Sequence, residues 1–201
     1  TAYAFVDFLA QAGQTYWQIL PLNPPNHNKS KDSPYQSFSA FAGNPYYIDL
    51  NRLMEEGVLL REEIEAVDFG HDPEHVDYDK MYANRFPLLR KAYERSGIAQ
   101  NPGYQSFIRE NGWWLDDYAL FMSLKSFFDQ KEWPDWPEDI SRHWNNAVEY
   151  YHRELYYDVE FHKYTQFKFY EQWYALKAYA NGKHIRIIGD IPIYVSFDST
   201  D

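Results

Sequence analysis

The sequence predicts an α/β protein, in which this chain supplies part of a (β/α)8 (TIM) barrel with a large, mostly helical inserted subdomain. Two short apolar segments have the composition of strands: residues 15–20 are expected to form a buried strand, and residues 185–188 a β-branched one. Most of the chain between them has helical periodicity, and a long helix precedes the second segment. This order favours parallel strands joined by a crossover. The first segment also feeds a long polar loop, as in the active sites of α/β barrels.

The first elements follow from capping and stop signals. Thr1 is a candidate N-cap for a helix that runs to about residue 12, where Gly13 stops it. After the strand at 15–20, a loop is expected over residues 23–44, because this stretch lacks a periodic apolar face. Short helices are expected over residues 51–56 and 61–66, with a loop over 68–75.

From about residue 80 onward the chain is predicted to be mostly helical. Four apolar residues share one face of the first helix, which Pro87 can kink: Met81, Leu88, Leu89 and Ala92. Further helices are expected over residues 104–110 and 113–127, from near residues 138 and 144, and over 159–180. An apolar stripe supports the last one: Phe169, Trp173, Leu176 and Ala180. Asn181 and Gly182 are expected to end it.

These elements divide the chain into three parts. Residues 1–50 are predicted to form an N-terminal barrel part with a strand and a substrate loop. Residues 51–155 form the inserted, mostly helical subdomain, and residues 156–201 a barrel helix and strand. A parallel barrel needs eight strands, and only two or three can be placed here. We therefore expect the chain to be an N-terminal fragment of a longer protein.

Composition argues against several classes of partner. The formal charge is −11 and no run of Lys or Arg occurs, which argues against nucleic-acid and anionic-membrane partners. No apolar stretch approaches the roughly 20 residues that a membrane span requires. The absence of cysteine fits a cytoplasmic location. Aromatic residues are 20% of the chain, and their flat apolar faces suit sugar rings, although helix packing explains most single aromatics.

The most informative segment is the loop sequence DSPYQSFSAFAGNP, residues 32–45. It presents Ser33, Tyr35 and Gln36 to a polar ligand, or else Tyr35 anchors a purely structural loop. Asp190 follows Gly189 at the end of the second strand, where it can bind hydroxyl groups or cap a turn. From position alone, both alternatives stay open for each residue. Asp32, Gln36 and Asn44 are more typical of turns or supporting contacts.

Three strings in this order resemble the 4-α-glucanotransferase (amylomaltase, or disproportionating enzyme) family. They are YWQILPL (16–22) with the loop 32–45, WLDDYALF (114–121) and IGDIPIYV (188–195). The resemblance implies transfer of α-1,4-glucan segments between maltooligosaccharides, without a metal or organic cofactor. It implies that Ser33, Tyr35 and Asp190 bind the maltooligosaccharide or starch-derived glucan. Asp190 would hold the glucose before the scissile bond and would not be the nucleophile.

The resemblance also implies a retaining mechanism, which uses two carboxyl groups about 5–5.5 Å apart. In the family, the nucleophilic Asp and the acid/base Glu lie in motifs after the Gly-Asp-x-Pro strand. We expect both beyond Asp201, so this chain has no catalytic residue of its own and is predicted to be inactive alone. The family often has an aromatic residue shortly before the substrate loop; residues 27–31 are HNKSK here, which puts that contact in doubt.

Other interpretations remain beside this one. A retaining α-glucan hydrolase would differ only in using water as acceptor, and a non-catalytic carbohydrate-binding module would need no carboxylate pair. A zinc site at His71 and His75 is disfavoured, because Pro73 argues against the helix that their spacing requires. The adjacent Asp116 and Asp117 point in different directions on a helix and are interpreted as interhelix or surface groups. Trp113 and Trp114 are interpreted as core or interface residues.

Overall fold

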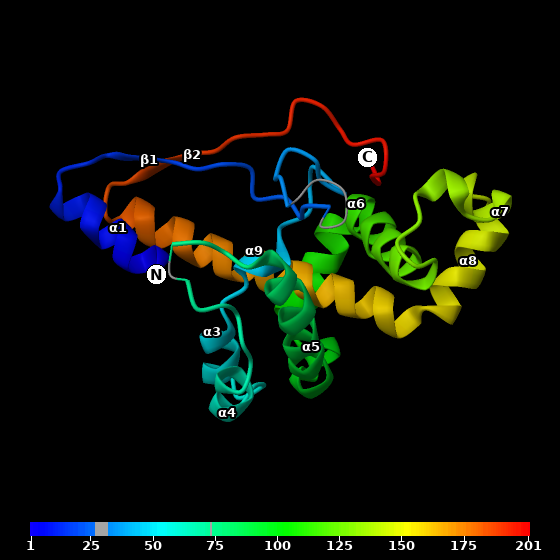
Figure 1. The fold of residues 1–201 in the computed structure, drawn as a ribbon, viewed down its shortest axis with the longest axis horizontal. Coiled ribbons are helices and arrows are strands. Elements are labelled where there is room, and N and C mark those ends of the chain that lie inside the picture. Colours follow the sequence, from blue (N-terminus) through cyan, green and yellow to red (C-terminus); the bar gives the residue numbers. More distant parts are fainter. Residues whose placement is uncertain (27–31, 73) are drawn as a thin grey trace.

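The computed structural model describes residues 1–26, 32–72 and 74–201, as one pair of strands and a series of helices (Figure 1). The strands are β1 (Tyr16–Gln18) and β2 (Arg186–Ile188). The helices in chain order are α1 (Ala2–Gln11), α3 (Leu50–Glu55), α4 (Arg61–Glu65), α5 (Tyr78–Ser96), α6 (Pro102–Phe127), α7 (Glu138–Ser141), α8 (Asn145–Glu154) and α9 (Tyr156–Gly182). Short 3-10 turns are η1 (Pro45–Tyr47), η2 (Ile98–Gln100) and η3 (Trp133–Asp135).

The two strands pair in parallel, with Trp17 opposite Ile187. Helices α1 and α9 lie along one side of this pair (Figure 1), and Val6, Leu9, Ala180 and Ile185 form a buried cluster there. Trp17 and Ile187 pack against this cluster. The parallel pair, with a helix directly before β2, confirms the α/β prediction. The described residues are mostly helical and form two strands.

The strands are not buried on both sides, so the expectation of a buried strand at residues 15–20 is wrong for this chain. Tyr16 is 53% exposed and Ile188 47% exposed, on the side away from α1 and α9. Side chains alternate across a strand, so each strand buries only every second residue. Leu20, which was expected to end the first strand, lies after β1 and is 61% exposed. The site described below is therefore built on a half-covered sheet.

Helix α6 corrects the prediction of two helices over residues 104–110 and 113–127. It starts with Asn101, whose side chain accepts hydrogen bonds from the amides of Gly103 and Tyr104, and with Pro102 in its first turn. It continues through Asn111 and Gly112. The Asn111 side chain donates to the carbonyl of Phe107, one turn earlier in the same helix, at 2.9 Å. Packing along α9 outweighs the poor helix propensity of these two residues.

The central core forms where α5, α6 and α9 meet the loop after η1. Leu88, Leu89 and Ala92 of α5 are buried as predicted, whereas Met81 is only partly buried. The predicted stripe on α9 divides between two clusters. Phe169 joins the central core with Trp173 against it, and Ala180 joins the cluster under the strands with Leu176 against it. Helix α9 thus connects the helical region to the strands.

Two helix ends differ from the predictions. Thr1 occupies the N-cap position of α1, but its side chain makes no capping hydrogen bond. Gly182 lies within the last turn of α9 instead of following it. Asp49 and Asp77 cap α3 and α5 by accepting hydrogen bonds from the amides of Asn51 and Lys80. Among the helices in the described residues, none combines the length and the apolar character needed to cross a lipid bilayer.

Candidate functional site

The loop after β1 is held in place by one buried side chain, that of Asn23. Its amide nitrogen donates to three backbone carbonyls of the loop, those of Ser39, Ala40 and Ala42, at 2.8–3.2 Å. Pro25 and Ser37 also form an antiparallel bridge, so the two ends of the loop run side by side. These contacts place residues 23–25 beside residues 37–42. Backbone groups of the loop on either side of residues 27–31 thereby find partners.

The far end of the same loop is seated on α9. The buried Gln166 side chain accepts from the amide of Gly43 at 2.7 Å and donates to its carbonyl at 2.9 Å. The face of Phe169 lies directly against Gly43, and a methyl group on Gly43 would come within 1.9 Å of this ring. Asn44 then caps η1 through the amide of Tyr46, which confirms its interpretation as a turn residue.

The structure brings together two of the three predicted site residues. The hydroxyl of Tyr35 donates to Oδ2 of Asp190 at 2.8 Å, across 155 positions of sequence. This hydrogen bond to a carboxylate raises the pKa of Tyr35, so the phenol stays protonated as a donor. The other oxygen of Asp190 accepts from the amide of Ile191 at 2.8 Å. Both residues lie beyond the carboxyl ends of the parallel strands, where open α/β sheets bind ligands.

Ser33 is not joined to this pair. Its hydroxyl accepts from the amide of Tyr35 at 3.4 Å, and its carbonyl accepts from the amide of Gln36 at 3.2 Å. It therefore shapes the turn that presents Tyr35. Sugar contact by Ser33 stays a prediction, and the same holds for Tyr35 and Asp190, which carry no ligand here.

A cleft of about 470 Å³ opens beside Tyr35. It is lined by Asn26, Tyr35 and Gln36 from the first loop, by Glu132, and by residues 194–198. Tyr35 is 45% exposed, so its ring is accessible from the solvent. The cleft has the size of a small-ligand site, and its walls combine phenol, amide and carboxylate groups with exposed aromatic rings. Such a set of groups suits a ligand with many hydroxyls and apolar ring faces.

The segment after β2 is tied down at its end by contacts that the sequence analysis missed. Asp198 forms an ion pair with Lys125 of α6 at 2.7 Å, and both side chains are almost fully buried. Asp201 accepts hydrogen bonds from Ser39 Oγ and from the amide of Ala40 in the first loop. The signal in the sequence was Lys125 itself, a single charge within the largely apolar residues 118–128.

The remaining candidates have structural surroundings. Asp116 contacts Lys163 of α9 at 2.7 Å, and Asp117 contacts His143 in an exposed setting at 3.6 Å, which confirms their interpretation as interhelix or surface groups. Trp114 is buried, but Trp113 is 67% exposed and packs edge-on against Phe41, so the core interpretation is wrong for Trp113.

His71 and His75 lie outside helices, beside Asp68 and Asp72. Over residues 1–26, 32–72 and 74–201, no cluster of three or more His, Asp or Glu side chains could hold a metal ion. Residues 27–31, where the family aromatic was sought, and Pro73 lie outside the described residues.

The sequence of the chain is similar to those of known proteins of one family. The chain is 47% identical over 201 residues to a 4-alpha-glucanotransferase of Clostridium butyricum, covering all of this chain and 41% of the relative. It is 43% identical to a 4-alpha-glucanotransferase of Thermus thermophilus, covering 98% of this chain and 39% of that protein. The chain thus spans about 40% of the length of these curated relatives.

Solved structures agree with the sequence relatives. The amylomaltase of Streptococcus agalactiae, solved in complex with acarbose, matches with a TM-score of 0.92 at 42% identity, over 99% of this chain and 40% of that one. The amylomaltase of Corynebacterium glutamicum shares the fold, with a TM-score of 0.74 at 19% identity. A family model described as 4-alpha-glucanotransferase matches residues 1–201. The chain therefore belongs to the 4-alpha-glucanotransferase family.

Proposed function

We propose that the protein carrying this chain is a 4-α-glucanotransferase, which moves α-1,4-linked glucan segments between maltooligosaccharides. The observation that carries the proposal is the contact between Tyr35 and Asp190 at the carboxyl ends of β1 and β2. Two polar groups from distant parts of a family member meet there, and Tyr35 also lines the open cleft. The acarbose bound to the Streptococcus agalactiae amylomaltase supports an oligosaccharide ligand for this cleft.

In this proposal, Tyr35 and Asp190 form part of the donor-side sugar site. The carboxylate of Asp190 accepts hydrogen bonds from glucose hydroxyls, and the phenol of Tyr35 holds that carboxylate while its ring faces the sugar. Ser33 supports Tyr35 through the turn and contributes its hydroxyl at the edge of the site. None of these residues is assigned as the nucleophile. No metal ion or organic cofactor has a role in the proposed reaction.

We further propose that β1 and β2 are two strands of a (β/α)8 barrel, and that the catalytic Asp and Glu come from outside these 201 residues. The retaining reaction needs a carboxylate that attacks the anomeric carbon and a second carboxyl group that first protonates the leaving oxygen. This second group then deprotonates the acceptor sugar. The half-exposed strands support the barrel, because Tyr16 and Ile188, on the side away from α9, would fill the interior of a closed barrel.

The test is to incubate the full gene product that carries these residues with maltotriose and to resolve the products by length. Glucose together with longer maltooligosaccharides is the expected result. Glucose and maltose alone would indicate a hydrolase. Unchanged maltotriose, with binding that Tyr35→Ala abolishes, would indicate a non-catalytic sugar-binding module. The isolated 201-residue chain is expected to leave maltotriose unchanged.

A substitution tests the role of the Tyr35–Asp190 contact. Tyr35→Phe removes the hydroxyl and keeps the ring, and we expect kcat/KM for maltotriose to fall about tenfold to 100-fold, since a hydrogen bond to a charged group contributes about 1.5–3 kcal/mol. Tyr174→Phe is the matched control, because Tyr174 is exposed on α9 and forms ring contacts with Tyr170. Equal kcat/KM in both variants would argue against a role for the contact.

A further inference from the structure

Lys125 lies at a junction of three segments and is almost fully buried, with a side-chain exposure of 2%. Its ammonium group donates to Oδ2 of Asp198 at 2.7 Å and to the carbonyls of Gln130 and Lys131 at 2.9 and 2.8 Å. All three donor positions of the ammonium are thereby used. The ring of Phe38, in the loop that carries Tyr35, lies 5.5 Å from the same nitrogen. One cation therefore contacts α6, the loop after β1 and the segment after β2.

The segment after β2 depends on this anchor. Between Asp190 and Asp198 the chain exposes its apolar side chains: Ile191 is 74% exposed, Ile193 85% and Tyr194 84%. The segment is joined to other elements at Phe197, whose carbonyl accepts from the Trp133 indole at 2.7 Å, and at Asp198, the partner of Lys125. The path of Asp190 is thus set by β2 on one side and by the Lys125–Asp198 pair on the other.

The first loop is tied to the same anchor. The carbonyl of Phe38 accepts from the amide of Thr200 at 2.9 Å, and Ser39 and Ala40 donate to Asp201. Phe38 is buried at 5% exposure, beneath the exposed turn that presents Tyr35. The two loops that meet at the Tyr35–Asp190 hydrogen bond therefore meet a second time around Lys125. Two separate attachments restrict how the loops can move relative to each other.

We propose that Lys125 is a positioning residue for the sugar site: it clamps the loop of Tyr35 and the segment of Asp190 to α6 and so sets their separation. The effect of Lys125 on catalysis rests on the proposed function, whereas its effect on the positions of the two loops does not. Loss of either partner of a buried ion pair leaves an uncompensated buried charge, which is strongly destabilising. The two charges are therefore both satisfied only when Lys125 and Asp198 stay together. A neutral residue at position 125 would allow the segment after β2 to leave α6. Asp190 would then lose its fixed distance from Tyr35.

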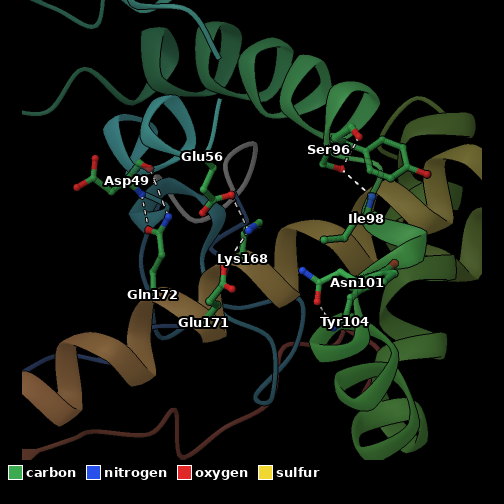
Figure 2. A network of polar contacts seen from close by, with 10 residues as sticks. Asp49, Glu56, Ser96, Ile98, Asn101, Tyr104, Lys168, Glu171 and Gln172 are labelled. Carbon is green, nitrogen blue, oxygen red and sulfur yellow. Dashed lines mark hydrogen bonds and ion pairs between the residues drawn. The ribbon is translucent and has the colours of Figure 1, made fainter. Parts of the chain in front are cut away.

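The test compares Lys125→Met with Lys168→Met in the full gene product. Lys168 is the matched control: it is also a buried lysine on a long helix, with Glu56 and Glu171 at 2.7 and 2.8 Å (Figure 2). It contacts neither loop segment around Lys125 in the described residues. Both variants are expected to lower the melting temperature. Only Lys125→Met is expected to lower kcat/KM for maltotriose, by about tenfold to 100-fold, since small misplacements of a site have effects of that size.

Kinetics are measured at a temperature where circular dichroism shows both variants folded, and amide hydrogen exchange is measured on the same samples. Faster exchange in residues 189–201 and 33–40 of Lys125→Met alone is expected. Lys125→Arg keeps the charge and is expected to recover part of kcat/KM. Asp198→Asn is expected to reproduce the loss, and it serves as the test if Lys125→Met does not fold.

The two proposals fail in different ways. If the wild-type protein leaves maltotriose unchanged, the transferase proposal fails, and hydrogen exchange alone decides whether Lys125 holds the two loops. If the wild-type protein is active and folded Lys125→Met and Asp198→Asn keep its kcat/KM and exchange pattern, Lys125 contributes only to stability. That result would overturn the positioning role.

Discussion

The two halves of α9 lie in different surroundings. Most of the residues buried on this helix lie in its first half: Val159, Phe161, His162, Tyr164, Thr165, Gln166, Phe167, Lys168 and Phe169. In the second half, residues 170–182, Ala180 alone is buried in the described structure. The first half is enclosed by α5, α6 and the loop after β1, whereas the second half meets α1 and the strands on one side (Figure 1).

The difference shows that the neighbours of a helix decide whether its polar residues become part of a core. The first half buries a histidine, a glutamine and a lysine, which are costly unless they are neutral or hydrogen-bonded. Gln166 holds the loop after β1, and Lys168 bridges two glutamates away from that loop. The enclosed half therefore positions the loop that presents Tyr35, through Gln166, and the open half packs against the strands.

The largest expected effect tests this comparison with two glutamines that make the same contact. Gln166 binds both backbone groups of Gly43 in the core, and Gln172 binds both backbone groups of Asp49 in an exposed setting (Figure 2). Gln166→Leu leaves two buried backbone groups unpaired, so we expect a loss of about 2–6 kcal/mol of unfolding free energy. Gln172→Leu is expected to cost below about 1 kcal/mol, because water replaces the lost partner.

Urea unfolding followed by tryptophan fluorescence measures both values. Similar losses for the two variants would show that burial does not separate the two halves of α9. The same experiment reports on the loop, because a shift of Gly43 moves the chain that presents Tyr35. Gln166→Leu is accordingly expected to lower sugar affinity as well, and Gln172→Leu to leave it unchanged.

A smaller effect is expected from two glycine substitutions, one at Gly43, which packs against the first half of α9, and one at Gly182 in the second half. Gly43→Ala forces a methyl group to within 1.9 Å of the Phe169 ring, and we expect overpacking to cost about 1–3 kcal/mol. Gly182→Ala, in the last turn of α9, meets no atom within 4 Å and is expected to stabilise by up to about 1 kcal/mol, because alanine favours helices over glycine. Thermal unfolding separates the two signs directly. A stable Gly43→Ala variant would mean that Phe169 can move aside.

The smallest expected effect on the free energy of unfolding near neutral pH comes from His162, in the enclosed first half of α9. Burial, with a further contribution from the charge of Arg90, lowers the pKa of His162 to about 3. The unfolded chain binds a proton near pH 6.5, whereas the folded chain stays neutral there. The unfolded state therefore binds more protons between these values, and the free energy of unfolding falls as the pH drops from 6.5 towards 3. The slope from this residue is about 1.4 kcal/mol per pH unit.

The check is to compare wild type and His162→Leu by urea unfolding at several pH values, each referred to its own stability at pH 7.5. The wild type is expected to lose stability more steeply on acidification. Parallel curves for the two proteins would contradict the assignment of a neutral, buried imidazole.

Local signals in the sequence were sufficient for much of the fold and for the centre of the site. The apolar stripe on α9 and the buried face of α5 follow from helical periodicity, which depends on neighbouring residues alone. Tyr35 and Asp190 were found because each follows an apolar strand in a string typical of the family. The start of α6 was missed by two residues although Asn101 and Pro102 are a recognisable cap and first turn.

By itself, the sequence determined which segments are helix or strand, the family, and the two polar residues at the strand ends. Tertiary structure alone decided that α6 runs unbroken past Gly112, that each strand is covered on one side, and that Lys125 pairs with Asp198 and Gln166 with Gly43. The reason is sequence distance: Lys125 and Asp198 are 73 positions apart, and Gln166 and Gly43 are 123 apart. No local pattern encodes a partner at that separation, and a polar group needs such a partner only once the chain has folded and removed it from water.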